Sequence, residues 1–493
     1  AQTQLVTEMA TQEKFLQLAL APAGSGKTTS MRVLASAWQD AHPHVEGASR
    51  AGGGVVGFAP TAVAAMELGA SIGTRADTLA KLVYHLDHPE QNEPEWMRQI
   101  GAGTMLIVDE AGMASTQDLA RLVEFARSRD AVIRLIGDDQ QLASVSAGGV
   151  LRDIAADAGA ITLSELVRFK DPAEAAATLA LRDGQSKALG FYIDHDRVRV
   201  TADGDIEDAV YGEWKSISDT GETALMLAYN NDTVRALNAR ARAERIDEGT
   251  VSTEREALLE GGLRASAGDV IVTRLNDRRL PVSLTDFVKN GDRWQVVEVT
   301  EGGDVTARHE KIGNVITLPA SYVASNVDLG YASTIHGAQG QTVHSSFVLA
   351  RGEETRQLLY VGMSRGTDMN RVFVPMGTDG DPHGMLKEDR INPRVATEIL
   401  EGILDRDGSQ VSATSDQRQQ NDPRTWLKLA AERYGDAVLL AATRAISDER
   451  RDAITAEAER LVPGVSDAPA WETLLGNLAL RDLDERDALE DLR

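Results

Sequence analysis

Residues 16–31 read LQLALAPAGSGKTTSM, an apolar run followed by a glycine-rich turn that ends in Lys27 and Thr28. A strand, a turn of this composition and a helix that begins at the lysine are the context of a phosphate-binding loop. In such a loop, glycines let backbone N–H groups approach the phosphates, the lysine neutralises phosphate oxygens, and the threonine hydroxyl ligates Mg²⁺. The strict pattern has glycine where this chain has Ala21, which an ordinary backbone conformation tolerates. The stretch therefore predicts an α/β fold that binds ATP and Mg²⁺.

Two further apolar runs end in polar residues that suit ATP hydrolysis. MLIVDE (105–110) ends in Asp109 and Glu110, and VIRLIGD (132–138) leads to Gln141. Two adjacent carboxylates favour a bound cation, so Asp109 is expected to hold Mg²⁺ through water and Glu110 to orient or deprotonate the attacking water. Gln141 offers a donor and an acceptor for the γ-phosphate or for that water. Taken alone, the acidic pair also fits a helix cap and the glutamine a surface turn.

Apolar runs and amphipathic stretches alternate through most of the first 375 residues, which indicates parallel α/β sheets. Strands are expected at 16–21, 54–59, 105–110, 132–138, 223–229, 345–350 and 371–375, and helices at 27–39, 61–70, 115–128 and 230–246.

Two regions depart from this pattern. Between 266 and 330, short β-like runs such as DRWQVVEVT and NVITLPASYV are separated by Gly-Asp and Asn-Gly turns, which predicts a small β-barrel inserted into an α/β domain. Residues 405–423 are polar and turn-rich, as in a linker, and the sequence after them predicts a helical tail.

The composition narrows the class of protein. A chain of 493 residues predicts about three domains. It contains no cysteine, which excludes disulfides, Cys-based zinc sites and thiol nucleophiles. The net charge of −25 opposes nucleic-acid binding overall, although a local basic groove can hold DNA on an acidic protein. Without an apolar run of about 18 residues or a signal peptide, we expect a cytoplasmic protein with no membrane insertion. A start without methionine also suggests a piece of a longer protein.

Five motifs occur in one order along the chain: PAGSGKTT, VDEAGM, GDDQQL, YASTIHGAQGQT and LYVGMSRG. They resemble motifs I, II, III, V and VI of the superfamily 1 DNA helicases. In detail they are similar to the RecD-like 5′→3′ branch, and within it to the helicase part of conjugative relaxase-helicases of the TraI/MobF type, particularly actinobacterial ones. The resemblance covers about residues 1–375, and a weaker one extends beyond 379.

The resemblance implies two RecA-like P-loop motor domains with a small SH3-like β-barrel insertion and a helical C-terminal tail. The implied divisions are a first motor domain at 1–165, a second at 166–378 interrupted by the insertion at 266–330, a connector and linker at 379–423, and a helical region at 424–493. The implied activity is ATP-dependent unwinding of DNA or translocation on single-stranded DNA in conjugative transfer. The implied partners are single-stranded DNA, a relaxase domain and the coupling or secretion proteins of conjugation.

Site residues follow from the same resemblance. Those implied to bind ATP are Gln2, which would read the adenine, with Gly24, Ser25, Gly26, Lys27, Thr28, Thr29 and Gly340. Those implied to act in hydrolysis are Lys27, Asp109, Glu110, Gln141, Arg168 and Arg365, the last as an arginine finger. Thr28 and Asp109 would hold Mg²⁺. DNA contacts are implied for Thr61, Thr78, Lys81 and His336, and Gln339 with its neighbours would couple nucleotide to DNA.

The chain order of these residues suits a motor. Lys27 belongs to one α/β domain and Arg365 to a second, so the arginine stabilises the transferring phosphoryl group only when the two domains close around ATP. DNA held by residues of both domains would then move stepwise. Each residue alone has a simpler interpretation: Thr61 as a helix N-cap, Lys81 as a solvated helix face, His336 as a core histidine, and the arginines as surface or capping residues.

Two other classes stay open from the sequence. One is a degenerate helicase fold that only binds single-stranded DNA or recruits a partner, and the intact motifs argue against it. The other is an ATPase switch that acts on protein. His42-Pro43-His44 is expected to be a loop rather than part of a nicking site. Trp294, Tyr322 and Phe287 are candidates for base stacking, and Trp426 and Trp471 are expected on tail helices as core or partner surface.

Overall fold

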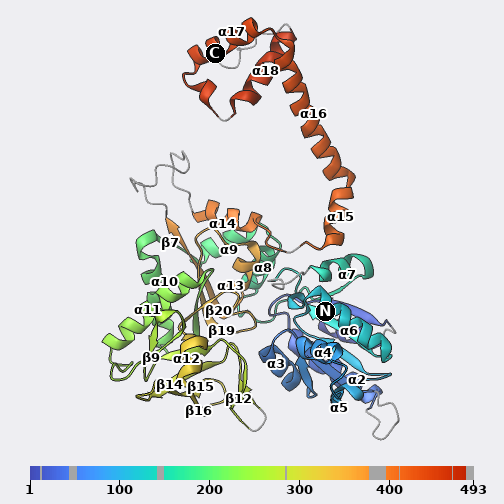
Figure 1. Cartoon of the computed structure of the whole chain (residues 1–493), viewed down its shortest axis with the longest axis vertical. Helices are drawn as coiled ribbons and strands as arrows, with labels where there is room; N and C mark the ends of the chain where they lie inside the picture. The colour runs from blue at the N-terminus through green and yellow to red at the C-terminus, as the bar shows by residue number, and fades with distance from the viewer. Residues whose placement is uncertain are drawn as a thin grey trace. The chain divides into compact units, whose positions relative to one another are not determined.

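A computed structural model of the chain (Figure 1) describes residues 1–11, 14–43, 53–141, 149–283, 286–376, 396–409, 411–468 and 470–484. The chain forms two compact units, Ala1–Gln410 and Val411–Arg493. The larger unit contains two separate parallel sheets and an antiparallel insertion.

The first sheet has six parallel strands in the order β3-β2-β4-β5-β1-β6. The strands are β1 (Leu16–Leu20), β2 (Val55–Ala59), β3 (Ala76–Thr78), β4 (Met105–Val108), β5 (Val132–Gly137) and β6 (Ile161–Thr162). Successive residues of the central strands enter two different cores: Leu106 and Val108 point to one face, Met105 and Ile107 to the other. Burial on both faces explains why these strands read as continuous apolar runs.

Helices cover both faces of this sheet. One core takes residues from α1 (Gln2–Thr11), α2 (Lys27–Ala41) and α3 (Ala62–Ile72). The other core takes residues from α4 (Leu79–Asp87), α5 (Glu95–Arg98), α6 (Thr116–Ser128) and α7 (Val150–Ala158).

The second sheet has five parallel strands in the order β18-β8-β19-β20-β7. The strands are β7 (Val198–Ala202), β8 (Ala224–Ala228), β18 (Ala332–Thr334), β19 (Val343–Leu349) and β20 (Gly366–Met376). Its two cores hold α8 (Pro172–Arg182), α9 (Lys187–Asp194), α13 (Arg356–Gly362) and α14 (Ala396–Asp405) on one side, and α10 (Ile206–Ser218) and α11 (Asn231–Asp247) on the other. The strands and helices expected from the apolar periodicity all form, with ends shifted by one to a few residues.

The insertion is an antiparallel sheet in the order β16-β15-β14-β11-β17. Its strands are β11 (Val270–Thr273), β14 (Arg293–Val299), β15 (Val305–His309), β16 (Val315–Leu318) and β17 (Val327–Leu329). Short pairs β9 (Ala257–Leu258) with β10 (Arg264–Ala265), and β12 (Asp277–Pro281) with β13 (Phe287–Val288), accompany it. The strand expected over 314–323 is wrong in its second half, because the chain turns at Pro319 into helix α12 (Ala320–Asn326).

The second unit is helical. It contains α15 (Ala413–Asn421), α16 (Pro423–Ala445), α17 (Asp448–Leu461) and α18 (Trp471–Leu483), and Ile446, Ile454 and Leu475 contribute to its own small core. The range 405–423, expected to be a linker, is partly helical, because Ser412 caps α15 by accepting a hydrogen bond from the Ser415 amide. Within the described residues, no helix combines the length and apolarity needed to cross a membrane.

A buried arginine fixes the first helix to the first sheet. Arg134 of β5 is fully buried, and its guanidinium donates to the carbonyl oxygens of Met9 at 2.9 Å and Lys14 at 3.0 Å. The same guanidinium lies 5.8 Å from the ring centroid of Trp38 on α2. Burial lowers the pKa of Arg134 to about 10. The side chain thus closes the end of α1 opposite to Gln2.

Arg134→Met is therefore expected to destabilise the first motor fold. The change leaves the buried Met9 carbonyl oxygen and the Lys14 carbonyl oxygen without this donor and costs about 2 kcal/mol. Thermal unfolding followed by circular dichroism measures the effect. Arg121→Met, on the exposed face of α6, is the control and is expected to stay within about 0.5 kcal/mol of the wild type. Equal losses in the two variants would contradict the assigned role.

Candidate active site

The glycine-rich turn joins the end of β1 to the start of α2. Gly24 and Gly26 have φ of 82° and 81°, the left-handed region that glycine adopts without strain. The non-glycine residues with positive φ in the described chain are Glu110, Asp130 and Asp196, so Ala21 has an ordinary backbone. Its amide donates to the Gly137 carbonyl at 2.8 Å. The departure from the strict pattern at this position is therefore harmless to the loop.

Lys27 meets both carboxylates that follow β4. Its Nζ lies 2.6 Å from Glu110 Oε1 and 3.1 Å from Asp109 Oδ1, and all three side chains are mostly buried. Burial opposes each charge. The two carboxylates nevertheless raise the pKa of Lys27, and Lys27 lowers the pKa of Glu110. Burial and the charge of Glu110 leave the pKa of Asp109 raised. Two negative charges against one positive charge leave a net negative corner, which suits a divalent cation.

Glu110 has an unusual backbone. Its φ and ψ are 50° and 38°, a conformation that costs a residue with a side chain roughly 1–3 kcal/mol. The position is held because the Glu110 amide donates to Asp109 Oδ1 at 2.8 Å and the Glu110 carbonyl accepts from the Met113 amide at 2.9 Å. The strain aims the carboxylate at the lysine. The sequence gives no signal for it.

The turn after β5 meets the second sheet. The Asp138 side chain is fully buried, and its Oδ1 accepts from Arg182 Nε at 3.0 Å and NH2 at 2.8 Å. Its Oδ2 accepts from the Gln141 side chain at 3.1 Å and from the Tyr360 hydroxyl at 2.9 Å. Gln141 also accepts from the Gln339 side chain at 3.3 Å. The residues predicted to sense the nucleotide therefore lie at a contact between the two sheets.

Two arginines from beyond the first sheet approach the same corner. Arg168 NH1 donates to the Ser364 carbonyl at 2.7 Å, and the Arg168 amide donates to the Gly24 carbonyl at 3.1 Å. A Cβ added at Gly24 would lie 2.6 Å from Arg168 Cβ, so only glycine fits this approach.

Arg365 is buried beside Arg168. Its Nε donates to the Val361 carbonyl at 2.8 Å and its NH2 to Ser364 Oγ at 2.8 Å. Burial and the neighbouring Arg168 charge lower the pKa of Arg365 to about 10, and burial lowers that of Arg168. Both arginines help to lower the pKa of Glu110. Among the described residues, no carboxylate lies within salt-bridge distance of either guanidinium.

The other residues predicted to bind nucleotide differ in whether they contact the phosphate loop. The Gln2 side chain donates to the Ser25 carbonyl at 2.9 Å and so contacts the phosphate loop. Thr28 and Thr29 are exposed at the start of α2. Gly340 has φ of 84° and is exposed, and no described contact joins it to the loop. Its nucleotide role stays a prediction.

The predicted DNA residues lie at strand ends. Thr61 follows β2 and caps α3, and Thr78 ends β3 and caps α4, with side-chain oxygens accepting from the Ala64 and Lys81 amides at 3.2 Å each. Because β2 and β3 are parallel neighbours, both caps lie at one edge of the sheet. Lys81 pairs with Asp77. His336, just beyond β18, is largely exposed, and partial burial lowers its pKa.

The aromatic candidates for base stacking in the insertion are mostly wrong. Trp294 is fully buried in the core of the insertion, and Tyr322 is 7% exposed with its hydroxyl bonded to the Leu275 carbonyl. Alternation along the strand turns Trp294 inward. Phe287 is half-buried, with the Arg278 guanidinium 4.6 Å from its ring centroid.

The remaining histidine and tryptophan candidates are placed as follows. His42 stacks on Trp38 at 4.2 Å, and His44 lies outside the described residues. Searching the described part of the chain finds no group of three or more histidines and carboxylates that could hold a metal. In the helical unit, Trp426 is 65% exposed and Trp471 packs partly on the core.

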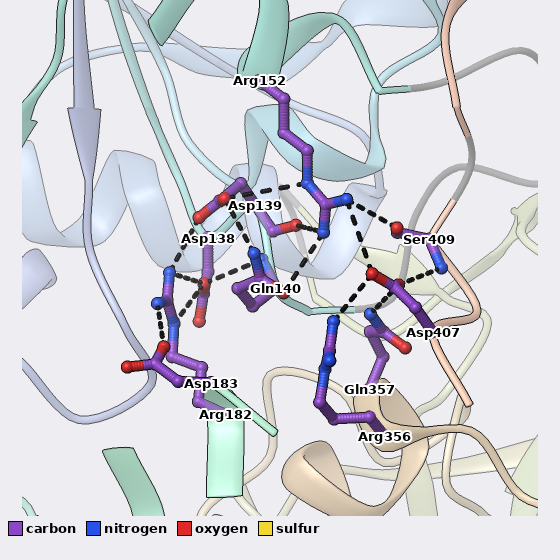
Figure 2. Close-up of polar contacts among 10 residues, drawn as sticks. All are labelled: Asp138, Asp139, Gln140, Arg152, Arg182, Asp183, Arg356, Gln357, Asp407 and Ser409. Atoms are coloured by element: carbon purple, nitrogen blue, oxygen red, sulfur yellow. Dashed lines mark hydrogen bonds and ion pairs between the residues drawn. The ribbon is translucent and has the colours of Figure 1, made fainter. Parts of the chain in front are cut away.

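A segment after α14 reaches both sheets, and the sequence did not indicate it. Figure 2 shows Arg152 of α7 between the Asp139–Gln140 turn and Ser409; Arg152 donates to the Asp139 carbonyl at 3.0 Å and to Ser409 Oγ at 2.6 Å. Asp407 in turn accepts from Arg356 at 2.7 Å and from Gln357 at 2.6 Å, both on α13. Residues 406–409 therefore join the two motor domains; we call them the strap.

Sequence comparisons give the relatives of this chain. A family model described as an AAA domain matches residues 1–203. A probable conjugal transfer protein TraA of Sinorhizobium fredii is 33% identical over 352 residues, 70% of this chain and 29% of that protein. The RecBCD enzyme subunit RecD of Mycolicibacterium smegmatis is 28% identical over 323 residues, 61% of this chain and 53% of that protein. The chain thus spans less than a third of the TraA relative.

A solved structure shares the fold. The crystal structure of Pif1 helicase from Bacteroides with ADP-AlF3 and single-stranded DNA superposes with a TM-score of 0.50 at 18% sequence identity, over 75% of this chain and 91% of that chain.

Two parallel sheets, a phosphate loop, paired carboxylates and arginines from the opposite side define a P-loop nucleotide-hydrolysing motor. With the comparisons above, the chain is similar to RecD-type helicase subunits and to conjugal transfer proteins.

Asp407→Ala is expected to release the strap. Burial opposes ionisation of Asp407, but hydrogen bonds from Ser409 and Gln357 and the charge of Arg356 lower its pKa to about 2, so it is ionised at neutral pH. Its removal takes away the acceptor shared by α13 and the strap. Amide exchange across 406–409, followed by mass spectrometry, should accelerate about tenfold. Asp405→Ala, at the exposed end of α14, is the matched control, and equal exchange in the two variants would contradict the assignment.

Proposed function

We propose that this chain is the helicase part of a relaxase-helicase, which hydrolyses ATP to move 5′→3′ along single-stranded DNA and unwind duplexes during conjugative transfer. The observation that carries the proposal is a pair of neighbouring arginines, Arg365, which is buried, and Arg168, which is half-buried. Neither guanidinium has a described carboxylate within salt-bridge distance, so the arginine side of the site suits an anion, whereas the carboxylate side suits a cation. The phosphate loop across from it makes the γ-phosphate of ATP the fitting one.

The proposed hydrolysis divides the work among the placed residues. Lys27 and the loop amides hold the phosphates, with Gln2 beside the loop on the base side. Thr28 and Asp109 would hold Mg²⁺, which supplies charge neutralisation at the phosphate oxygens. When ATP is bound, Lys27 exchanges its carboxylate contacts for phosphate, which frees Glu110 to orient or deprotonate the attacking water.

The arginines and the glutamine complete the proposed site. Gln141 senses the γ-phosphate and passes the signal to Gln339. Arg168 and Arg365 stabilise the charge that develops on the transferring phosphoryl group. Because Arg365 belongs to the second sheet, its engagement draws the two motor domains together.

The proposed DNA track uses the edge where β2 and β3 end. Thr61 and Thr78 cap helices whose N-terminal amides suit phosphate groups. His336 and its neighbours contribute from the second domain, so closure shortens the distance between two grips on the strand. We assign 1–165 and 166–378 to the two motor domains, 266–330 to an SH3-like insertion, 379–423 to a connector and 424–493 to a helical region. Because the proposed activity acts on DNA inside the donor cell, we propose that the protein works in the cytoplasm.

Lys27→Ala is expected to reduce ATP turnover by about 100-fold or more, because the charge that neutralises the phosphate oxygens is lost. Phosphate release is measured with and without single-stranded DNA. Lys187→Ala, an exposed lysine at the start of α9, is the matched control and should retain full turnover. Normal turnover in Lys27→Ala would overturn the assignment of the site.

Polarity and substrate are decided by two further measurements on the wild type. Single-stranded DNA should stimulate hydrolysis strongly, because DNA held by both domains favours the closed form. A duplex with a 5′ single-stranded tail should be unwound and one with a 3′ tail should not. Unwinding of the 3′-tailed duplex would refute the polarity, and hydrolysis indifferent to DNA would favour a switch that acts on protein.

A further inference from the structure

One buried hydroxyl joins three parts of the motor. Tyr360 of α13 is fully buried, and its hydroxyl accepts a hydrogen bond from the Ala23 amide of the phosphate loop at 2.9 Å. The same hydroxyl donates to Asp138 Oδ2 at 2.9 Å. Ala23 follows β1 and Asp138 follows β5, which are neighbouring strands of the first sheet, whereas α13 packs on the second.

The helix that carries Tyr360 also places the arginines. Arg365 donates to the Val361 carbonyl, one residue after Tyr360, and Arg168 donates to the Ser364 carbonyl. A displacement of α13 and of the residues that follow it therefore shifts carbonyl oxygens to which both guanidinium groups donate. Burial and the negative charge of Asp138 raise the pKa of Tyr360 well above its usual value, so the phenol keeps its proton and continues to donate.

The two partners of the Tyr360 hydroxyl differ in the other hydrogen bonds that they make. Asp138 also accepts from Arg182, Gln141 and the Gln140 amide, so it stays satisfied without the phenol. The Ala23 amide donates to Tyr360, and a buried amide that loses its acceptor is costly. Removal of the hydroxyl therefore acts on the phosphate loop more than on the stability of the acidic turn.

We propose that Tyr360 is a positioning residue for ATP hydrolysis, whose hydroxyl aligns the phosphate loop and the Asp138–Gln141 turn with Arg168 and Arg365. The proposal rests on the function proposed above. It assigns to Tyr360 the alignment of the first motor domain's part of the site with the second domain's part. Tyr360 contacts no reacting atom in this role. Its hydroxyl contacts Ala23 of the loop, whereas the described contacts of Lys27 are with Asp109 and Glu110.

Tyr360→Phe is the test, because it removes the oxygen and keeps the ring. With single-stranded DNA at saturation, kcat for ATP is expected to fall about tenfold while KM for ATP changes less than about twofold, since ground-state binding is retained and alignment in the transition state is lost. Tyr192→Phe is the matched control. Tyr192 is also buried, and its hydroxyl pairs with Thr178 Oγ1 at 2.9 Å, within the second motor domain.

The control separates alignment from folding. Both variants lose one buried phenol hydroxyl, so both should show a comparable shift in thermal midpoint, and only Tyr360→Phe should lose kcat. Equal kcat in the two variants would overturn the proposal. A combined variant with Asp138→Asn should lose less kcat than the product of the two single losses, since Tyr360 acts partly through Asp138. If the two single losses of kcat multiply in the combined variant, Tyr360 does not act through Asp138.

Amide exchange gives a readout that does not depend on hydrolysis. In Tyr360→Phe, the peptide that contains Ala23 should exchange faster than in the wild type and in Tyr192→Phe. Unchanged exchange there would overturn the positioning role even if the wild type is an active ATPase. A wild type that hydrolyses no ATP would instead refute the proposed function, while faster exchange in the variant would still support the link between Tyr360 and the loop.

Discussion

The buried carboxylate of Asp138 is the constraint around which the two motor domains are arranged. A carboxylate without solvent is costly unless several donors surround it. Its own turn supplies Gln141 and the Gln140 amide, and the other donors are Arg182 and Tyr360 from the second domain. The charge can be satisfied only when the two sheets are adjacent. One acidic side chain thus links the end of β5 to helices α8 and α13 of the second domain.

The residues that the sequence could predict are those with local signals. β1, β4 and β5 were visible because both faces are buried and each run ends in a recognisable polar turn. Tyr360 was not, because in LYVG it reads as another core residue and its partner Ala23 lies 337 positions away. The contact of Arg152 with Ser409 spans 257 positions and likewise leaves no periodic trace. The prediction that Trp294 stacks on bases was wrong for a related reason. An aromatic residue in an alternating strand does not reveal which face of the strand is buried.

The acidity of the chain bears on how it would hold a strand of DNA. Lys81, a basic candidate at the proposed track, is paired with Asp77, and Asp77 also accepts from Arg75. Burial opposes the charge of Asp77, but the Lys81 contacts lower its pKa, so the pair stays ionic. Thr61 and Thr78 instead mark helix N-termini, where amide groups carry partial positive charge without basic side chains. Such a track suits a protein of net charge −25, because the attraction between helix N-terminal amides and a DNA phosphate is short-ranged and local.

In the proposed mechanism, the arginine pair requires both domains and an anion at the same time. Burial and the charge of Arg168 lower the pKa of Arg365, and burial lowers the pKa of Arg168. In the described chain both side chains are held by carbonyl oxygens and a hydroxyl rather than by carboxylates. A carboxylate partner would satisfy them permanently and would compete with phosphate. Carbonyl oxygens fix their direction and leave the charge available. In the proposed mechanism, these charges are used when a phosphate group lies between Lys27 and the two guanidinium groups.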